Sequence, residues 1–358
     1  MQRVGEHGTN RVFRFLRNHP ILVLALLSPG IPEYMSGSSD MAVLALNPVA
    51  FLLFLGLNMG LYSTGVLLIR EAVVRWKKGW ASVLLLGFAY AILEEGLALQ
   101  TLFNPLAQPV GNLGVYGRWL GVNWVWTVGL LLFHSAYSIA LPIFLFGMAF
   151  PKLKSKSLLS NRATAACLTI LSADSMLLYT IVRYWPGWEL ILLSTGSIAL
   201  LVFGARRIPA DLLTVSPGLP SRRPLVTGVL AGLFFPAALL TGAVAAGTNI
   251  HPFIPIVLDI LFSFVILRAV LRSLGSHSNQ THRLAVVIGL AVPIVCFGII
   301  ARITIPLIIL ADLAFAIFIS RLWRRIHLST IGPGLGTPLG SVRTCVVFEG
   351  LLSGCRAS

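Results

Sequence analysis

Long apolar runs recur along this chain, and they constrain its fold more than any other feature. A helix needs about 20 mostly apolar residues to cross the hydrocarbon core of a bilayer. Ten candidate spans follow one another: 20–35 (interrupted by Pro29-Gly30-Ile31-Pro32), 48–69, 80–103, 123–150, 163–183, 189–205, 225–247, 252–271, 284–300 and 303–322. Only 11% of the residues are charged, whereas a soluble domain carries about 25%. The chain is therefore predicted to be an all-α polytopic transmembrane bundle, and a soluble fold is excluded.

The charges that are present lie between the apolar runs. The formal net charge is +15, which by itself would suggest a nucleic-acid partner. If the N-terminus is cytoplasmic, however, only Arg118, Arg183 and Arg302 of the 27 Lys and Arg residues fall on the outer side. Cytoplasmic loops of membrane proteins carry such an excess of positive charge. This pattern predicts that both termini are cytoplasmic, that the partner is the lipid bilayer of the plasma (inner) membrane, and that no nucleic acid is bound.

The two ends of the chain differ in composition from the bundle. Residues 1–19 form a basic segment, predicted to be a cytoplasmic N-terminus, and 20–322 form the transmembrane bundle. Residues 323–358 are rich in glycine and proline over much of their length, which predicts a flexible cytoplasmic tail.

Six ionisable side chains lie well inside the predicted spans, where each costs about 2.5–3.5 kcal/mol by insertion scales. They are Glu94 and Glu95 in the third span, His134 in the fourth, Asp174 in the fifth, Asp259 in the eighth and Asp312 in the tenth. At about 1.5 Å of rise per residue they share one layer, slightly to the outer side of the midplane. Residues of this kind usually mark a site or an ion path, so Asp174, Asp259 and Asp312 are candidate binding residues.

Glu94, Glu95 and His134 carry the most specific chemistry. A carboxylate beside an imidazole is the smallest set of groups that can activate a water molecule, either directly or through a metal. We assign Glu94 as the candidate general base, His134 as its partner and Glu95 as the orienting carboxylate. Tyr90, one turn before Glu94, is a candidate hydrogen-bond donor to it. A divalent metal at Glu94 and His134 is a candidate cofactor, whose identity the sequence leaves open.

Over about residues 90–135 the chain resembles the CPBP family, the CAAX-protease and bacteriocin-processing (Abi) intramembrane proteases. Glu94-Glu95 resembles the start of the family's EExxxR motif, and Phe133-His134 the end of its FxxxH motif. The resemblance implies a helical bundle in which a Glu and a His activate water to cleave a peptide bond, here in a membrane-embedded peptide.

The chain departs from the family's pattern at three places. Leu99 stands where the first motif has Arg, and Leu130 stands where the second motif has Phe. The candidate for the family's third motif is His251, with a proline at the fourth position after it. These departures concern the groups that would brace the Glu pair and complete the site.

Two other hypotheses stay open. Ten spans divide into five plus five, and an odd number of spans per half gives halves of opposite orientation, as in many secondary transporters. Asp312 in the last span then corresponds to Asp174 in the fifth, and buried acids are what coupling of a small solute to protons or cations requires. Alternatively, the acids only pair helices in a structural or accessory protein. The distance between the Glu pair and His134 separates the first hypothesis from these two.

Overall fold

The computed structural model describes residues 14–37, 47–107, 113–213, 223–275, 278–302 and 306–330. Most of the predicted basic N-terminus and of the predicted tail lies outside these ranges. Among the described residues, eight helices are long and apolar enough to cross a membrane, and Pro20–Met35 is a shorter apolar helix. The protein is thus an all-α polytopic bundle, as expected, whereas the number of crossings and the cytoplasmic position of the termini stay predictions.

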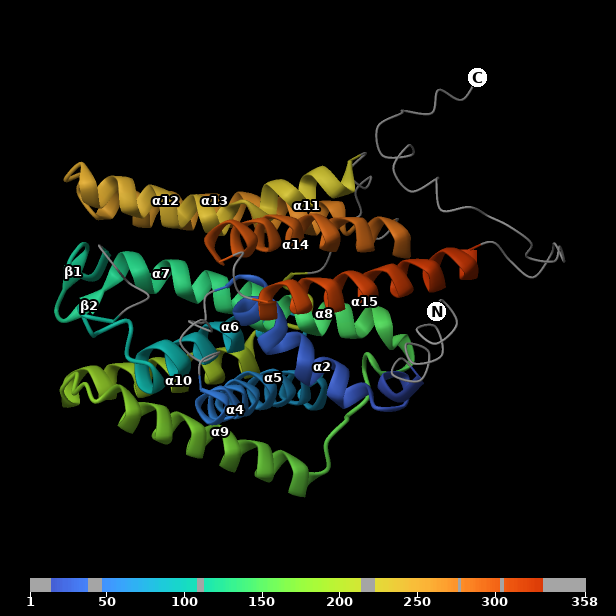
Figure 1. The fold of residues 1–358 in the computed structure, drawn as a ribbon, viewed down its shortest axis with the longest axis horizontal. Coiled ribbons are helices and arrows are strands. Elements are labelled where there is room, and N and C mark those ends of the chain that lie inside the picture. Colours follow the sequence, from blue (N-terminus) through green and yellow to red (C-terminus); the bar gives the residue numbers. More distant parts are fainter. Residues whose placement is uncertain are drawn as a thin grey trace, which may run out of the picture.

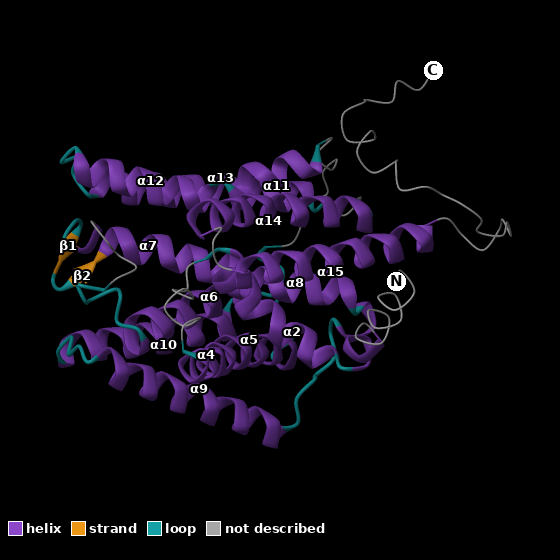
Figure 2. Ribbon diagram, in the orientation of Figure 1, coloured by secondary structure: helices purple, strands orange, loops and turns teal. Residues whose placement is uncertain are grey.

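The first four predicted spans are continuous helices that change type along their length (Figures 1 and 2). They are α2 (Pro20–Pro29) with η1 (Gly30–Met35); α4 (Pro48–Asn58) with η2 (Met59–Ser63) and α5 (Thr64–Arg75); α6 (Trp80–Ala91) with η3 (Ile92–Ala98); and α7 (Trp124–Phe133) with η5 (His134–Ala140) and α8 (Leu141–Ala149). The other long helices are α9 (Asn161–Val182), α10 (Trp188–Arg207), α11 (Pro224–Gly232), α12 (Phe234–Gly247), α13 (Phe253–Ser273), α14 (Gln280–Arg302) and α15 (Pro306–Thr330).

The helices run roughly parallel to one another (Figure 1). In this view α9 forms one edge and the group α11 to α14 the opposite edge, with α2, α6 and α8 between them. Helix α9 has no buried residue, and α13 buries only Pro255, Asp259 and Ser273. Their exposed apolar side chains are therefore expected to face lipid. The core lies instead among the first four predicted spans together with α14 and α15.

The described helices contain four π-helical turns, η1, η2, η3 and η5, one in each of the first four predicted spans. A π turn closes i→i+5 hydrogen bonds, so it holds one residue more than an α-helical turn, and such turns are frequent at functional sites. Pro29-Gly30-Ile31-Pro32 does not break the first span, because the chain continues from α2 into η1. Proline lacks an N–H and usually disrupts an α-helix, and here the helix changes type at the prolines without ending.

A short hairpin determines where α7 begins. Strand β1 (Arg118–Trp119) pairs antiparallel with β2 (Val122–Asn123), and Gly121 in the connecting turn has a φ of 79°, which suits glycine. Asn123 then caps α7, because its Oδ1 accepts a hydrogen bond from the backbone N–H of Trp126 at 3.1 Å. An asparagine at this position satisfies a backbone donor that the first helical turn leaves free. The cap sets the depth of α7 and hence of the π turn that follows it.

Two helix ends differ from the prediction. The helical part of the third span ends at Ala98, earlier than expected, because Gln100 adopts a positive φ of 58°. The following turn stays buried, so hydropathy alone could not separate it from the helix. Helix α15 continues to Thr330, further than expected. Its last turns are held because Ile326 packs into the core and Arg325 donates hydrogen bonds of 2.7 and 2.8 Å to carbonyls at the end of α8.

The end of α5 holds the loop between α8 and α9. The buried guanidinium of Arg70 donates to the carbonyl of Lys156 at 2.9 Å. The carboxylate of Glu71 accepts hydrogen bonds from the backbone N–H of Leu158 at 2.9 Å and from Nε of Arg75 at 2.7 Å. Because loop carbonyls and amides both have partners, the loop has a defined path, and it leads α9 to its place at the edge of the bundle.

Arg75→Gln is expected to lower the free energy of unfolding by about 1 kcal/mol, a modest loss because the side chain is 34% exposed and its charge is screened. The guanidinium also donates to the carbonyl of Leu159 and to Oδ1 of Asn161, at 2.6 and 2.7 Å. Loosening the loop should speed tryptic cleavage after Lys154, followed by mass spectrometry. The exposed Arg162→Gln is the control, and equal cleavage rates in the two variants would contradict the proposed role of Arg75.

Candidate functional site

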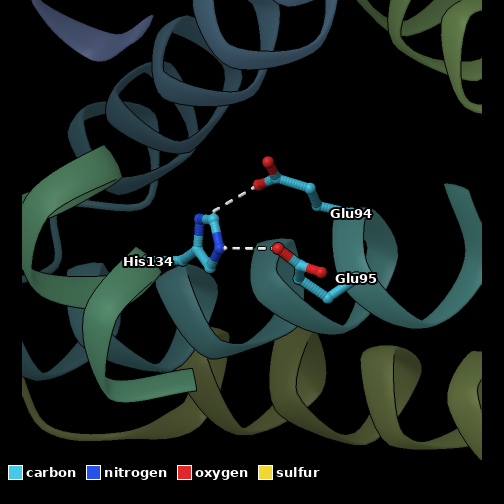
Figure 3. A group of neighbouring side chains, drawn as sticks. All are labelled: Glu94, Glu95 and His134. Atoms are coloured by element: carbon cyan, nitrogen blue, oxygen red, sulfur yellow. Dashed lines mark hydrogen bonds and ion pairs between the residues drawn. The ribbon is translucent and has the colours of Figure 1, made fainter. Parts of the chain in front are cut away.

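His134 lies between two adjacent carboxylates (Figure 3). Oε2 of Glu94 is 3.1 Å from Nδ1 of the imidazole, and Oε1 of Glu95 is 3.1 Å from Nε2. All three residues are buried, with at most 7% of each exposed. Adjacent carboxylates on an α-helix point about 100° apart. Here both lie in the π turn η3, and both contact the same ring.

A close approach of two helices brings these groups together. Gly87 of α6 faces Ser135, the residue after His134, and a Cβ atom at Gly87 would lie 2.7 Å from the Cα of Ser135. The hydroxyl of Ser135 donates to the carbonyl of Leu84 at 3.0 Å. Glycine is therefore required at this contact. It allows the backbones of α6 and η5 to approach until side chains of ordinary length span the gap between them.

A chain of hydrogen bonds orients the imidazole through Glu95. Oε1 of Glu95 pairs with Nε2 of His134 at 3.1 Å, and Oε2 accepts a hydrogen bond from the hydroxyl of Thr101. The indole Nε1 of Trp126 donates to the same hydroxyl oxygen at 3.2 Å. An indole N–H can only donate, so the proton of Thr101 is left for Glu95. Both oxygens of Glu95 then act as acceptors, and the network assigns the proton of this hydrogen bond to Nε2.

The other ring nitrogen faces Ser138 and Glu94. Nδ1 of His134 is 3.0 Å from the hydroxyl of Ser138, one turn further along η5. It is also 3.1 Å from Glu94, but neither oxygen of Glu94 has a well-aligned hydrogen bond among the described residues. Buried carboxylate oxygens normally have such partners. The carboxylate of Glu94 therefore retains the capacity to bind a water molecule and to take its proton.

The donor atoms of this group also suit a metal ion. Glu94, Glu95 and His134 each offer one ligand atom, and these atoms lie within 4.8 Å of one another. Carboxylate oxygen and imidazole nitrogen are ordinary ligands of zinc. The two carboxylates approach opposite nitrogens of the ring, however, and one ion binds only one of them. A metal at this place would thus be held by one nitrogen of His134 and would require one carboxylate to move.

Two residues of this region, Glu33 and Tyr62, were not among the predicted site residues. Glu33 lies near the end of the first span, where η1 brings it to η2, and the hydroxyl of Tyr62 donates to its Oε1. The ring of Tyr62 lies 5.9 Å from that of Tyr90 and 6.2 Å from the imidazole of His134. The hydroxyl of Tyr90 interacts with the carboxylate of Glu94, as expected, although the geometry is not that of a well-aligned hydrogen bond. An acid beside a proline-rich interruption of a span was the signal available in the sequence.

The three deep aspartates lie elsewhere, and none of them joins the donor group of Glu94 and its partners in the described chain. Asp174 on α9 packs against Gly60 of η2, where a Cβ atom would lie 1.7 Å from its Oδ2. Asp312 is half-buried on α15, and its oxygens have no hydrogen-bond partner among the described residues. Asp259 lines a pocket beside α7 and α12. Three of the six predicted residues are thus brought together, and a shared depth did not imply a shared chamber.

Comparison with known proteins assigns a family but no activity. The model of an uncharacterized membrane protein family matches residues 22–330, which include the whole helical bundle and all six deep ionisable residues. No curated protein and no solved structure matches the chain. The match agrees with a multi-pass protein in a lipid bilayer.

Proposed function

The chain belongs to an uncharacterized membrane protein family, and we propose that it is a membrane-embedded hydrolase of the CPBP type. In this proposal Glu94 is the general base, His134 is its partner, and Glu95 holds the imidazole in place. One observation supports it above all others: the imidazole has a carboxylate oxygen 3.1 Å from each of its nitrogens, and Glu94 keeps unused hydrogen-bonding capacity.

The chemistry follows from these positions. A water molecule held by the carboxylate of Glu94 gives a proton to it as the water oxygen attacks the carbonyl carbon of a peptide bond. The C–N bond then breaks, and the same proton passes to the leaving nitrogen. This is general acid–base catalysis by one carboxyl group, which typically contributes about 10²–10⁴-fold. Glu95 keeps the ring oriented throughout, as the third group of a catalytic triad does.

The burial of the site restricts its substrates. Each residue of the group is at most 7% exposed, so water and substrate reach it only through a movement between helices. Exclusion of bulk water strengthens the electrostatic interactions inside such a site. A peptide that is itself embedded in the membrane approaches between helices without leaving lipid, and this is the substrate class that we propose.

The structure shows what surrounds two of the positions at which the chain departs from the CPBP motifs. His251 is exposed at the start of α13, where its Nδ1 accepts a hydrogen bond from the backbone of Phe253 at 3.3 Å. It does not belong to the Glu94 group, so the proposal assigns it no role. Leu99 stands where the family has an Arg to brace the Glu pair, and here His134 lies between the carboxylates instead. The proposed site is therefore smaller than the family's, with one His.

The test uses the full chain in proteoliposomes made in H₂¹⁸O. Synthetic transmembrane peptides, with and without a prenylated cysteine near the C-terminus, are incorporated as substrates. Cleavage should produce fragments whose new carboxyl group carries one ¹⁸O atom, detected by mass spectrometry. The same assay with a chelator decides whether a metal is needed. The hydrolase proposal would be wrong if no ¹⁸O-labelled fragments form. A solute-driven change of lumenal pH that Asp312→Asn removes would then favour a transporter.

A further inference from the structure

A second site lies outside the Glu94 group, in a pocket between α7, α12 and α13. Its polar group is the carboxyl of Asp259, a residue only 4% exposed on a helix that otherwise faces outward. The other walls are apolar and include the rings of Trp126 and Phe235 and the side chains of Leu130 and Leu239. The proposed hydrolysis makes no use of this carboxyl group.

The carboxyl of Asp259 lacks a partner among the described residues. It forms no hydrogen bond or ion pair with any residue of the described chain, and its place inside a predicted span makes an uncompensated charge costly. The indole N–H of Trp126, which also lines the pocket, already donates to Thr101. A buried polar group without a partner calls for an explanation, and here it faces an open volume.

The size and the lining of the pocket limit what can bind there. The volume is about 20 Å³, room for about one water molecule. A water molecule would fit, but it would leave the charge of the carboxylate uncompensated. A metal ion needs several ligands, and the pocket supplies one carboxyl group. A primary ammonium group is as small as a water molecule and carries the opposite charge, and its alkyl chain would extend out of the pocket along the exposed apolar faces of α12 and α13.

We propose that this pocket binds the ammonium group of an alkylamine, with the carboxylate of Asp259 as counter-ion and the rings of Trp126 and Phe235 beside it. Aromatic rings attract cations, and a charge-assisted hydrogen bond inside the bundle is stronger than a neutral one. The proposal does not rest on the proposed hydrolysis, although Trp126 lines this pocket and also donates to Thr101 in the chain of hydrogen bonds that orients Glu95. The amine comes either from a free alkylamine or from an amino-lipid of the bilayer.

The experiment measures the thermal midpoint of the full chain in phosphatidylcholine nanodiscs during titration with n-butylammonium. The wild type should show a saturable rise, because a ligand that binds only the folded state stabilises it. Isosteric n-butanol should give none. Asp259→Asn should weaken the apparent affinity by about tenfold or more, the value of a charged hydrogen bond. Asp312→Asn, which removes a carboxylate on a different helix, should leave the rise unchanged.

A second variant blocks the pocket without removing the charge of Asp259. Gly129 lines the pocket, and a Cβ atom there would meet nothing within 4 Å. Gly129→Leu should therefore fold normally, keep Asp259 and lose the response to butylammonium. Gly196→Leu, at a second open glycine on α10, should keep it. No rise in the wild type, an equal rise with butanol, or an unchanged rise in both Asp259→Asn and Gly129→Leu would each overturn the proposal.

A second thermal-unfolding experiment, with a different lipid, distinguishes the two sources of the amine. Nanodiscs that contain phosphatidylethanolamine should raise the midpoint of the wild type above that of Gly129→Leu if the ligand is an amino-lipid. A difference between these proteins that appears only with added butylammonium assigns the pocket to a free amine.

Discussion

Glu94→Gln is expected to abolish hydrolysis while leaving the thermal midpoint of the protein unchanged or raised. The amide has the shape of the carboxylate but cannot take a proton from water, so the rate should fall by about 10²–10⁴-fold. Stability should not fall, because both oxygens of Glu94 are buried without a well-aligned hydrogen bond among the described residues, and removing a poorly compensated buried charge is favourable. The ¹⁸O assay and thermal unfolding of the same sample measure the two effects.

The controls for this prediction separate catalysis from folding. His134→Ala should also abolish cleavage, although the cavity that it leaves lowers the midpoint. Asp174→Asn removes a carboxylate from a helix that lies outside the group and should keep the wild-type rate. If Glu94→Gln and His134→Ala both retain full cleavage, the assignment of the site is wrong. If Glu94→Gln instead unfolds the protein, the carboxylate has a structural role in pairing helices.

Gly87→Val is expected to cost about 2–3 kcal/mol of stability and to abolish cleavage as well. The new Cβ atom would lie 2.7 Å from the Cα of Ser135, and backbone atoms cannot rotate aside as a side-chain end can. Overpacking of this kind typically costs about 1–3 kcal/mol, and a contact with backbone belongs at the upper end. Moving η5 away from α6 would also lengthen the contact between Glu95 and His134. Thermal unfolding and the ¹⁸O assay again provide the measurements.

Gly56→Val provides the matched control for this change. Gly56 is exposed on α4, and a Cβ atom there would meet nothing within 4 Å. The same substitution should therefore leave both the midpoint and the rate close to those of the wild type. A wild-type midpoint in Gly87→Val would show that α6 and η5 do not approach as closely as described. The short distances between His134 and the two carboxylates would then be contradicted as well.

Much of the architecture could be predicted from local composition. The apolar runs predicted the order of the helices, and the first span was predicted over the residues that α2 and η1 occupy, 20–35. The end of η3 could not be predicted in this way, because the turn after Ala98 is buried and carries apolar side chains such as Leu102 and Phe103, as a continuing helix would. The contact of Glu33 could not be predicted either, because an acid near the end of a span usually lies at the interface, whereas η1 carries Glu33 to Tyr62 in the interior.

The sequence by itself determined that this protein is a helical membrane bundle, and it identified Glu94, Glu95 and His134 as unusual, because a charge inside an apolar run is costly wherever the helices pack. The tertiary structure alone decided that both carboxylates contact one imidazole, and that Asp259 faces a separate pocket. Depth along a helix follows from position in the chain. Lateral neighbours depend on helix packing, and at this site on a π turn and on the contact at Gly87, which no local pattern encodes.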